Sequence, residues 1–359
     1  MPEPFKNYLN KNVIVLFATS FSEVCPSFDS ASFEKSVMDD KWENRELMER
    51  IHHITAILKA HLPDDYLEAL KILKKVYSNF SGMGTTVFPD FVQTYGLDYF
   101  DESVEALDFF TRNSTSEFAV RPFIKKYGSR MMKVMNRWAE SDNEDVRRLS
   151  SEGCRPRLPW AIALPQFKKD PKPIFPILEK LINDESEYVR KSVANNLNDI
   201  SKDNPEFVIS FAKKWLGKNK ESDWIIKHAC RTLLKNGDHE TLKLFGYIDP
   251  KHIKMKNFSV DKSVKMGDDL SFSFSLTSIG CNLGKIRVEY MMHFLRKNGK
   301  LNQKVFKISE FTCNKSEITY QKKYSFKQIT TRKYYPGTQE IEIVVNGKSF
   351  SKKSFELIR

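Results

Sequence analysis

The spacing of apolar residues changes from a helical to a strand-like period near residue 250 of this chain. Before that point apolar residues recur every three or four positions, so those of 174–182 fall on one face of a helix. After Phe258 apolar and polar residues alternate, as in Leu270–Leu276, which is the pattern of half-buried strands. Because one core seldom grows beyond about 250–300 residues, the 359 residues are expected to form two domains, 1–250 and 256–359.

A repeated motif marks the helical region. An acidic turn followed by an apolar–basic pair opens a helix at Val146-Arg147, again at Val189-Arg190, and again at Ile226-Lys227. The intervals of 43 and 37 residues fit two-helix HEAT-like repeats, whose units stack because one helix pair cannot bury its apolar face alone. The first domain is therefore predicted to be an all-α HEAT-like repeat solenoid.

The second region has the texture of an all-β immunoglobulin-like sandwich. Its candidate strands are short and are separated by turn signals such as Asn298-Gly299 and Asn346-Gly347. About seven short strands in a stretch of this length are typical of that architecture. The candidates are 270–276, 286–293, 304–308, 320–326 and 340–345. No tryptophan follows Trp224, so the pattern of true antibody domains is missing and the prediction concerns architecture alone.

The excess of positive charge lies almost entirely in the last third of the chain. Residues 256–359 carry 20 lysines and arginines against 9 aspartates and glutamates, whereas the rest of the chain carries 38 against 37. Concentrated positive charge favours polyanions, since neutralising phosphates releases their counterions. We therefore expect the sandwich to clamp DNA, although a surplus that only keeps the protein in solution would explain the charge equally well.

Other features limit the functional classes. No apolar run approaches the roughly 20 residues that cross a bilayer, and the apolar patch 13–18 is short for a secretory signal. We therefore expect a cytoplasmic protein that makes no membrane contact. The five cysteines are an odd number with no C-x-x-C pair, which indicates reduced, mostly buried thiols. The histidines are scattered and His52-His53 is better explained structurally, so we expect neither a metal nor a cofactor.

The most unusual stretch is 147–161, where a helix is expected to end at Gly153 because two prolines follow. Glu152 would then lie in the last helical turn, where the helix dipole disfavours a carboxylate. A solvated pair between Arg148 and Glu152 would explain this without any function. The neighbouring side chains instead combine guanidinium groups that bind phosphate with a flat apolar surface, and they are Arg148, Arg155, Arg157 and Trp160.

Two further acids are candidates. Glu117 follows Ser116, which could equally be a helix cap with a favourable first-turn acid, so Glu117 alone would count as structural. Asp199 comes at the end of the helix that Val189 opens, again at the end that disfavours an acid. Three acids at the edges of successive repeats would line one concave face.

Four segments of the chain resemble the AlkC branch of the HEAT-like alkylpurine DNA glycosylases. They are 50–54, 91–97, 116–123 and 152–160, of which the Arg-Pro-Arg-Leu-Pro-Trp run at 155–160 is specific. The resemblance covers roughly residues 1–250. Some members of that branch also carry a C-terminal immunoglobulin-like domain, in agreement with the strand pattern.

The resemblance implies active-site acids at Glu117, Glu152 and Asp199, DNA contacts at Arg148 and Arg155, and an aromatic wall at Trp160. To these contacts we add Arg157 as an expected DNA-binding residue because it belongs to the same basic cluster. The resemblance also implies hydrolytic excision of cationic methylated bases from double-stranded DNA without base flipping. The expected substrates are chiefly 3-methyladenine, with 3-methylcytosine and 1-methyladenine accepted by related enzymes. A monomer is expected, because an open repeat array needs no partner to close it.

Two rival interpretations remain at this stage. HEAT-like arrays and immunoglobulin-like sandwiches both serve as non-catalytic scaffolds that bind proteins or nucleic acids. The chain could also recognise damage without chemistry. Carboxylates repel phosphate, so acids at three matching positions favour the enzyme.

Overall fold

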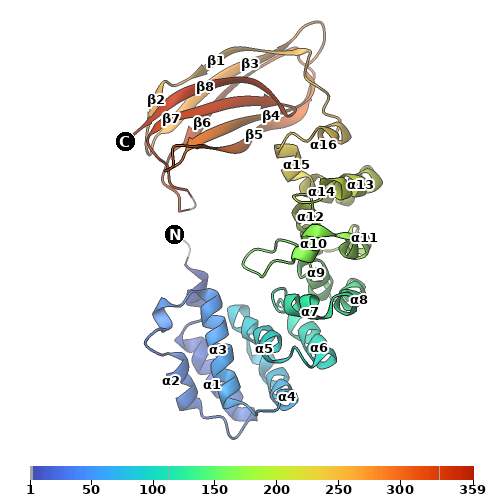
Figure 1. Ribbon diagram of the computed structural model, residues 1–359, viewed down its shortest axis with the longest axis vertical. Helices are drawn as coiled ribbons and strands as arrows, with labels where there is room; N and C mark the ends of the chain where they lie inside the picture. Colours follow the sequence, from blue (N-terminus) through green and yellow to red (C-terminus); the bar gives the residue numbers. More distant parts are fainter. Residues whose placement is uncertain (1–2, 113, 331) are drawn as a thin grey trace. The chain divides into compact units, whose positions relative to one another are not determined.

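The computed structural model describes residues 3–112, 114–330 and 332–359. It divides into two compact units, Met1–Ala229 and Cys230–Arg359. Figure 1 shows that the first unit is built of helices and that the strands lie in the second. Helices followed by an immunoglobulin-like sandwich confirm the predicted fold class.

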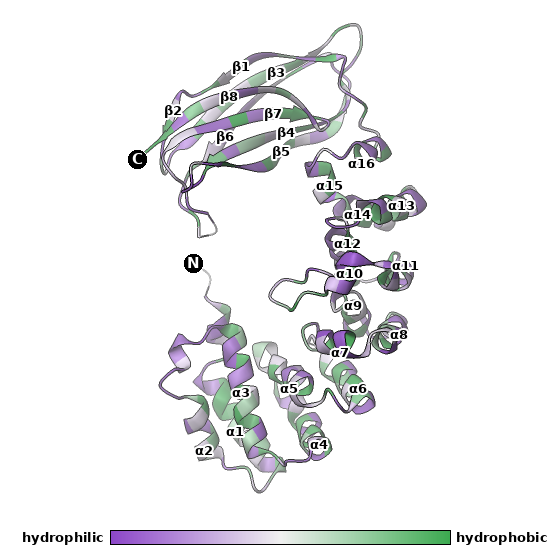
Figure 2. Cartoon of the chain, in the orientation of Figure 1, coloured by the Kyte–Doolittle hydropathy of each residue, from purple (hydrophilic) through white to green (hydrophobic). Residues whose placement is uncertain are grey.

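The first unit consists of helices that turn an apolar face towards their neighbours, and Figure 2 shows hydrophobic and hydrophilic residues side by side along them. Some begin at a side chain that accepts a free N–H group of the first turn, as Asn143 does for Val146 N at 3.1 Å. The helices are α1 (Lys11–Val24), α2 (Ser30–Val37), α3 (Leu47–His61), α4 (Tyr66–Val76), α5 (Val87–Tyr95), α6 (Phe100–Thr111), α7 (Val120–Tyr127), α8 (Ser129–Trp138), α9 (Glu144–Glu152), α10 (Pro165–Lys169), α11 (Phe175–Leu181), α12 (Glu187–Ile200), α13 (Pro205–Trp215) and α14 (Lys220–Ala229), with short 3₁₀ turns η1 (Phe5–Tyr8), η2 (Trp42–Asn44), η3 (Tyr77–Asn79), η4 (Gly82–Thr86) and η5 (Lys172–Ile174).

One contact recurs in two successive repeats. Arg147 Nη1 donates to the carbonyls of residues 141 and 142, both at 3.0 Å. Arg190 Nη1 donates to the carbonyls of residues 184 and 185, at 2.7 and 2.8 Å. In both, the basic residue of the sequence motif ties its helix to the preceding acidic turn. The repeat inferred from the motif is therefore a structural one in these two units. The third expected opening, at Ile226-Lys227, is wrong, because α14 already begins at Lys220 and the pair lies within the helix.

The second helices of successive repeats stack on one another, α9 on α12 and α12 on α14 (Figure 1). Each contributes a buried apolar row, for example Val189, Val193 and Leu197 of α12. Stacking in register brings the carboxyl ends of α9 and α12 next to each other. Glu152 and Asp199 lie at those two ends.

The second unit holds two packed sheets. One has the strand order β1-β3-β6 and the other β2-β8-β7-β4-β5, with antiparallel pairing except between β2 and β8. The alternation in β3 places Leu270, Phe272, Phe274 and Leu276 in the core. The elements are α15 (Arg231–Lys235), α16 (His239–Leu244), β1 (Ile253–Val260), β2 (Ser263–Lys265), β3 (Asp269–Ser278), β4 (Gly284–Leu295), β5 (Leu301–Cys313), β6 (Glu317–Ser325), β7 (Gly337–Val345) and β8 (Lys348–Ile358).

Three of these strands, β1, β2 and β8, were not among the sequence candidates. In β8 only Phe355 and Leu357 are buried, and the lysines and serines before them leave no apolar alternation to detect. The strand is nonetheless paired on both sides, with β2 and β7. Hydrogen bonding along the backbone therefore defines it more than side-chain burial does.

Along the chain, the boundary between the two compact units comes before the change of hydrophobic period, because the last two helices pack with the sandwich. The Tyr247 hydroxyl donates to the carboxylate of Glu310, and Asn346 Nδ2 donates to the Ile248 carbonyl at 3.0 Å. Gly237 and Gly347 also approach closely, since a Cβ on Gly237 would lie 3.1 Å from the Gly347 carbonyl oxygen. These contacts place α15 and α16 in the second unit.

The remaining expectations concern thiols, metals and membranes. All five cysteines are free and only Cys281 is exposed, so the thiols are mostly buried, as the sequence predicted. Burial raises the pKa of Cys154 to about 12. Across the described ranges, no His, Cys, Asp and Glu side chains gather as a metal site would require. In the same part of the chain, every helix is too short or too polar to span a bilayer.

Candidate active site

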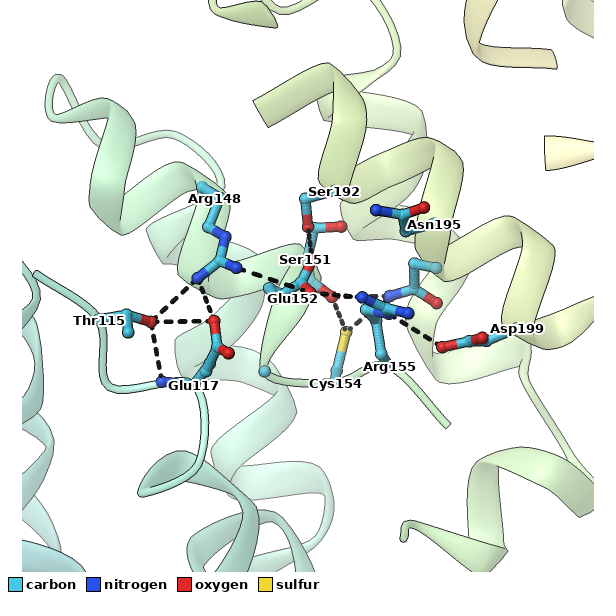
Figure 3. A network of polar contacts seen from close by, with 12 residues as sticks. Thr115, Glu117, Arg148, Ser151, Glu152, Cys154, Arg155, Ser192, Asn195 and Asp199 are labelled. Carbon is cyan, nitrogen blue, oxygen red and sulfur yellow. Dashed lines mark hydrogen bonds and ion pairs between the residues drawn. The ribbon is translucent and has the colours of Figure 1, made fainter. Parts of the chain in front are cut away.

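Glu117, Glu152 and Asp199 come from three different elements and join one continuous network of polar contacts (Figure 3). Glu117 lies in the turn before α7, Glu152 is the last residue of α9, and Asp199 lies in the last turn of α12. Two arginines, Arg148 and Arg155, connect the acids to one another. Side chains up to 82 positions apart thus share one site.

Arg148 links the first two acids. Its Nη1 donates to the Glu117 carboxylate and, at 2.9 Å, to Thr115 Oγ1, while its Nη2 lies 3.6 Å from Glu152 Oε1. Thr115 in turn donates to Glu117 Oε2 at 3.1 Å. Burial alone would lower the pKa of Arg148, but the adjacent carboxylates of Glu117 and Glu152 raise it above its ordinary value. The guanidinium is therefore a fixed positive charge.

Arg155 links the second and third acids. Its Nη1 donates to Glu152 Oε1, and its Nε donates to Asp199 Oδ2 at 2.9 Å. The second oxygen of each acid also has a donor: Ser192 Oγ lies 2.7 Å from Glu152 Oε2, and Lys202 Nζ lies 2.9 Å from Asp199 Oδ1. Glu152 and Asp199 are thus held in fixed orientations.

The network balances three carboxylates with three cations, and it does so largely out of water. The side chains of Glu152 and Asp199 are 7% and 3% exposed, and that of Glu117 is 15% exposed. Buried charges persist in proteins only when they are paired and hydrogen-bonded. The helix-end position of Glu152, unfavourable by itself, is offset by the two guanidinium groups. The arrangement can present preorganised negative charge to a cationic species.

The predicted DNA-contacting arginines differ in accessibility. The side chains of Arg148 and Arg155 are 13% and 10% exposed, and carboxylates bind two of the guanidinium nitrogens of each. Arg157 is 39% exposed and forms a two-pronged pair with Asp203 at 2.9 and 2.6 Å. Direct phosphate contact therefore stays a prediction for all three, and Arg157 is the one best placed to make it.

Trp160 lies on the loop between α9 and α10 and is 73% exposed. Its φ of 63° is in the left-handed region, which non-glycine residues rarely adopt. The ring packs edge-on against Phe5, 6.4 Å between centroids, beside a hollow of about 480 Å³. Within the described part of the chain, no hydrogen bond or ion pair joins Trp160 to the three acids. The loop presents this ring to solvent.

The comparisons with known proteins agree with this geometry. The model of the DNA alkylation repair enzyme family matches residues 49–233, which is more than half of the chain. The chain belongs to the DNA alkylation repair enzyme family. A second model, the C-terminal immunoglobulin-like domain of the uncharacterised protein YhaZ, matches residues 254–359. The family predicted from the four sequence segments is confirmed.

Two known proteins match nearly the whole chain. The chain is 43% identical to the uncharacterized protein YhaZ of Bacillus subtilis strain 168, over 98% of this chain and 99% of that protein. It is 34% identical to the Pseudomonas fluorescens alkylpurine DNA glycosylase AlkC, solved bound to DNA containing an abasic site analog. That structure matches with a TM-score of 0.94 and covers 99% of this chain and 100% of that one.

Sequence reasoning missed four residues that contact this site. Thr115, Ser192 and Lys202 hydrogen-bond to the acids, and Arg121 donates to a backbone carbonyl of the loop that carries Arg155. Ser192 was detectable, because it precedes Asp199 by two helical turns and so shares its face of α12. Arg121 had no comparable signal, since one arginine in a short helix gives no pattern.

Proposed function

We propose that the chain is a monofunctional DNA glycosylase, a hydrolase that excises cationic alkylated bases from double-stranded DNA. The observation that carries this proposal is the network in which Arg148 and Arg155 hold Glu117, Glu152 and Asp199 together. The similarity to the Pseudomonas fluorescens alkylpurine DNA glycosylase AlkC supports it. The expected substrate is 3-methyladenine, with 3-methylcytosine and 1-methyladenine as further candidates.

The catalytic role of the acids follows from the positive charge on the substrate base. A methylated base that carries a positive charge is already a good leaving group, so no acid need protonate it. As the bond from C1′ to the base nitrogen breaks, the deoxyribose gains oxocarbenium character. Carboxylates fixed beforehand stabilise that charge, and one of them orients or deprotonates the attacking water. The ion pairs with arginine keep the carboxylates in place, so little reorganisation accompanies the reaction.

Trp160 suits removal of the base without flipping it into a pocket. Its exposed, loop-borne ring would press on the deoxyribose of the damaged nucleotide and shield it from bulk water. An aromatic face near a developing cation adds about 0.5–2 kcal/mol of attraction. An enzyme of this kind would need no cofactor and would leave the base in or near the stack until it departs.

The sandwich would hold the DNA backbone. Exposed cations gather where the β4–β5 hairpin and the loop before β7 line a hollow of about 560 Å³, with Arg296, Lys297 and Lys333 among its residues. Contacts of this type are independent of sequence and add long-range attraction. A monomer acting on one duplex in the bacterial cytoplasm fits this role.

A single-turnover release assay tests the proposal. Enzyme in excess is mixed with methylated duplex, and free bases are separated and identified by mass. Release of 3-methyladenine at a rate well above the spontaneous rate is expected. Tight binding of the methylated duplex without release would identify a damage recogniser, and equal weak binding to damaged and intact duplex would favour the scaffold.

A further inference from the structure

The loop that carries Arg155 and Trp160 has little backbone structure of its own. Its internal hydrogen bonds are long, at 3.4 Å from Ala161 N to the Leu158 carbonyl and 3.3 Å from Leu164 N to the Pro156 carbonyl. Trp160 adds a backbone conformation that costs a non-glycine residue free energy. Something outside the loop must therefore hold it in this shape.

The guanidinium of Arg121 hydrogen-bonds to backbone carbonyls at both ends of this loop. Arg121 lies in the first turn of α7 and is fully buried. Its Nη1 donates to the Gly153 and Arg155 carbonyls at 2.9 and 2.8 Å, and its Nε donates to the Ile162 carbonyl at 2.6 Å. The two ends of the loop are thereby tied to one rigid planar group.

Burial of the Arg121 guanidinium costs free energy, because few polar partners replace the water that it loses. Across the described residues no carboxylate forms an ion pair with Arg121, and its Nη2 lacks a hydrogen-bond partner. Burial lowers the pKa of Arg121 to about 10. A buried cation held only by carbonyls would be replaceable by an apolar side chain if packing were its only task.

The carbonyl contacts of Arg121 hold the backbone that positions Arg155 in the network of acids. The backbone that Arg121 holds at residue 155 is the backbone from which the Arg155 side chain reaches Glu152 and Asp199. Its hold at residue 162 lies two positions after Trp160. One buried group thus fixes the cation between two acids and the exposed ring.

We propose that Arg121 is a positioning residue that sets the placement of Arg155 and Trp160 for base excision. The proposal rests on the proposed glycosylase function. Arg121 touches no DNA in this role; it acts through the loop. Misplacing a catalytic group by about 1 Å can slow a reaction roughly 100-fold, which defines the size of effect to look for.

The test compares two variants of Arg121 with a matched control in the full-length protein. Arg121→Lys keeps the charge but cannot bind both loop ends with a planar fork, and Arg121→Met keeps an unbranched side chain without the donors. Arg190→Lys is the control, because Arg190 also donates to two backbone carbonyls but lies outside the network. Single-turnover rate, DNA dissociation constant and thermal midpoint are measured for each.

The expected result is a split between rate and binding. Arg121→Lys should slow base release about 10- to 100-fold while the dissociation constant for DNA changes less than about 3-fold. Acrylamide quenching of Trp160, obtained by difference from a Trp160→Phe background, should change in Arg121→Lys and stay constant in Arg190→Lys. Arg121→Met should slow release at least as much.

Two outcomes overturn the inference. Wild-type rates and unchanged Trp160 quenching in a folded Arg121→Lys protein would show that the loop needs no such support. Equal losses of rate in Arg121→Lys and Arg190→Lys, in proportion to their thermal midpoints, would show a general stability effect. Absence of base release by the wild-type protein would instead contradict the proposed function, so the two failures are distinguishable.

Discussion

Arg155 Nε donates to Asp199 Oδ2 at 2.9 Å, across 44 positions of sequence. The pair joins the loop after α9 to the end of α12, so it spans two successive repeats. Repeat stacking alone would bring two acids together at this place, and like charges so close would repel. Arg155 lies between the two carboxylates and hydrogen-bonds to both, so its positive charge offsets their repulsion and holds them in place.

The first prediction concerns Glu152, the acid that both arginines contact. Glu152→Gln keeps the shape and the hydrogen bond from Ser192 but removes the negative charge. Base release should fall by about 100-fold or more, in the range that loss of a catalytic carboxylate produces. Binding of methylated duplex should survive or tighten, because a charge that repels phosphate is gone. Single-turnover release and fluorescence anisotropy measure the two quantities.

Glu179→Gln provides the matched control for this change. Glu179 pairs with Lys214 at 2.7 Å on the surface and belongs to α11, outside the network. Its rate should equal that of the wild-type protein. Glu117→Gln should resemble Glu152→Gln. Near wild-type release by both network variants would mean that these acids are not the catalytic ones.

The second prediction separates the roles of two arginines. Arg157→Ala should reduce the slope of log affinity against log salt by about one unit, because Arg157 is exposed enough to meet a phosphate. Its stability should hardly change, since exposed ion pairs contribute about 0–1 kcal/mol. Arg155→Ala should instead destabilise the fold by about 3–5 kcal/mol, because it leaves buried carboxylates unpaired.

Salt titrations of DNA binding and chemical denaturation check both statements. An unchanged salt slope for Arg157→Ala would remove that residue from the DNA interface. Wild-type stability of Arg155→Ala would show that water or another cation replaces the guanidinium without cost.

The sequence was sufficient to place the acids but not to pair them. Glu152 and Asp199 were detectable because each is an acid at a helix end that disfavours it, which is a local property of the chain. Ser192 shares the face of α12 with Asp199, but its hydrogen bond to Glu152 depends on how α9 and α12 stack. The contacts of Thr115 and Arg121 depend on packing in the same way, and no local pattern encodes that packing. The buried Arg148 and Arg155 were expected at a phosphate interface for the same reason, since exposure is set by neighbouring repeats.

The boundary between the compact units could not be predicted from the sequence either, because it too depends on packing. The change of hydrophobic period marks where strands begin, and β1 does begin at Ile253. Whether α15 and α16 belong with the strands is decided by close contacts such as that between Gly237 and Gly347. Those contacts join residues far apart in sequence, so no periodicity could reveal them.

The third prediction concerns Gly153, which ends α9 in a right-handed conformation, so it is not required for a positive φ. A Cβ at this position would lie 2.4 Å from Val120 Cγ2 and 3.0 Å from the Leu149 carbonyl oxygen. Gly153→Ala should therefore destabilise the fold by about 1–3 kcal/mol through overpacking. Thermal denaturation of Gly153→Ala alone and with Val120→Ala checks this cause, since the second change should restore most of the loss.

The fourth prediction is a pH dependence at the pair of His52 and Asp90. His52 Nδ1 lies 2.9 Å from Asp90 Oδ1, and this hydrogen bond raises the pKa of His52 above its ordinary value of 6.5. A raised pKa in the folded state means that protonation stabilises the fold. The contribution is complete below about pH 6.5 and is lost as the pH rises through the higher folded pKa. Unfolding measured from pH 5 to 9 should lose this slope in His52→Gln, and an identical pH profile would contradict the assignment.

The last prediction concerns the basic end of the sandwich. The triple variant Arg296→Gln, Lys297→Gln and Lys333→Gln removes three exposed cations beside the β4–β5 hairpin. It should weaken binding to damaged and intact duplex alike, with a salt slope shallower by about three units if each contacts one phosphate. Excision should fall at limiting enzyme and recover at saturating enzyme, because the acids in the helical unit are untouched.

A control triple, Lys262→Gln, Lys322→Gln and Lys323→Gln, removes the same charge from other exposed positions of the sandwich. Equal losses in both triples would mean that net charge alone attracts the DNA. Full binding by the first triple would mean that this end of the sandwich does not hold the duplex, and its charge would then need another explanation.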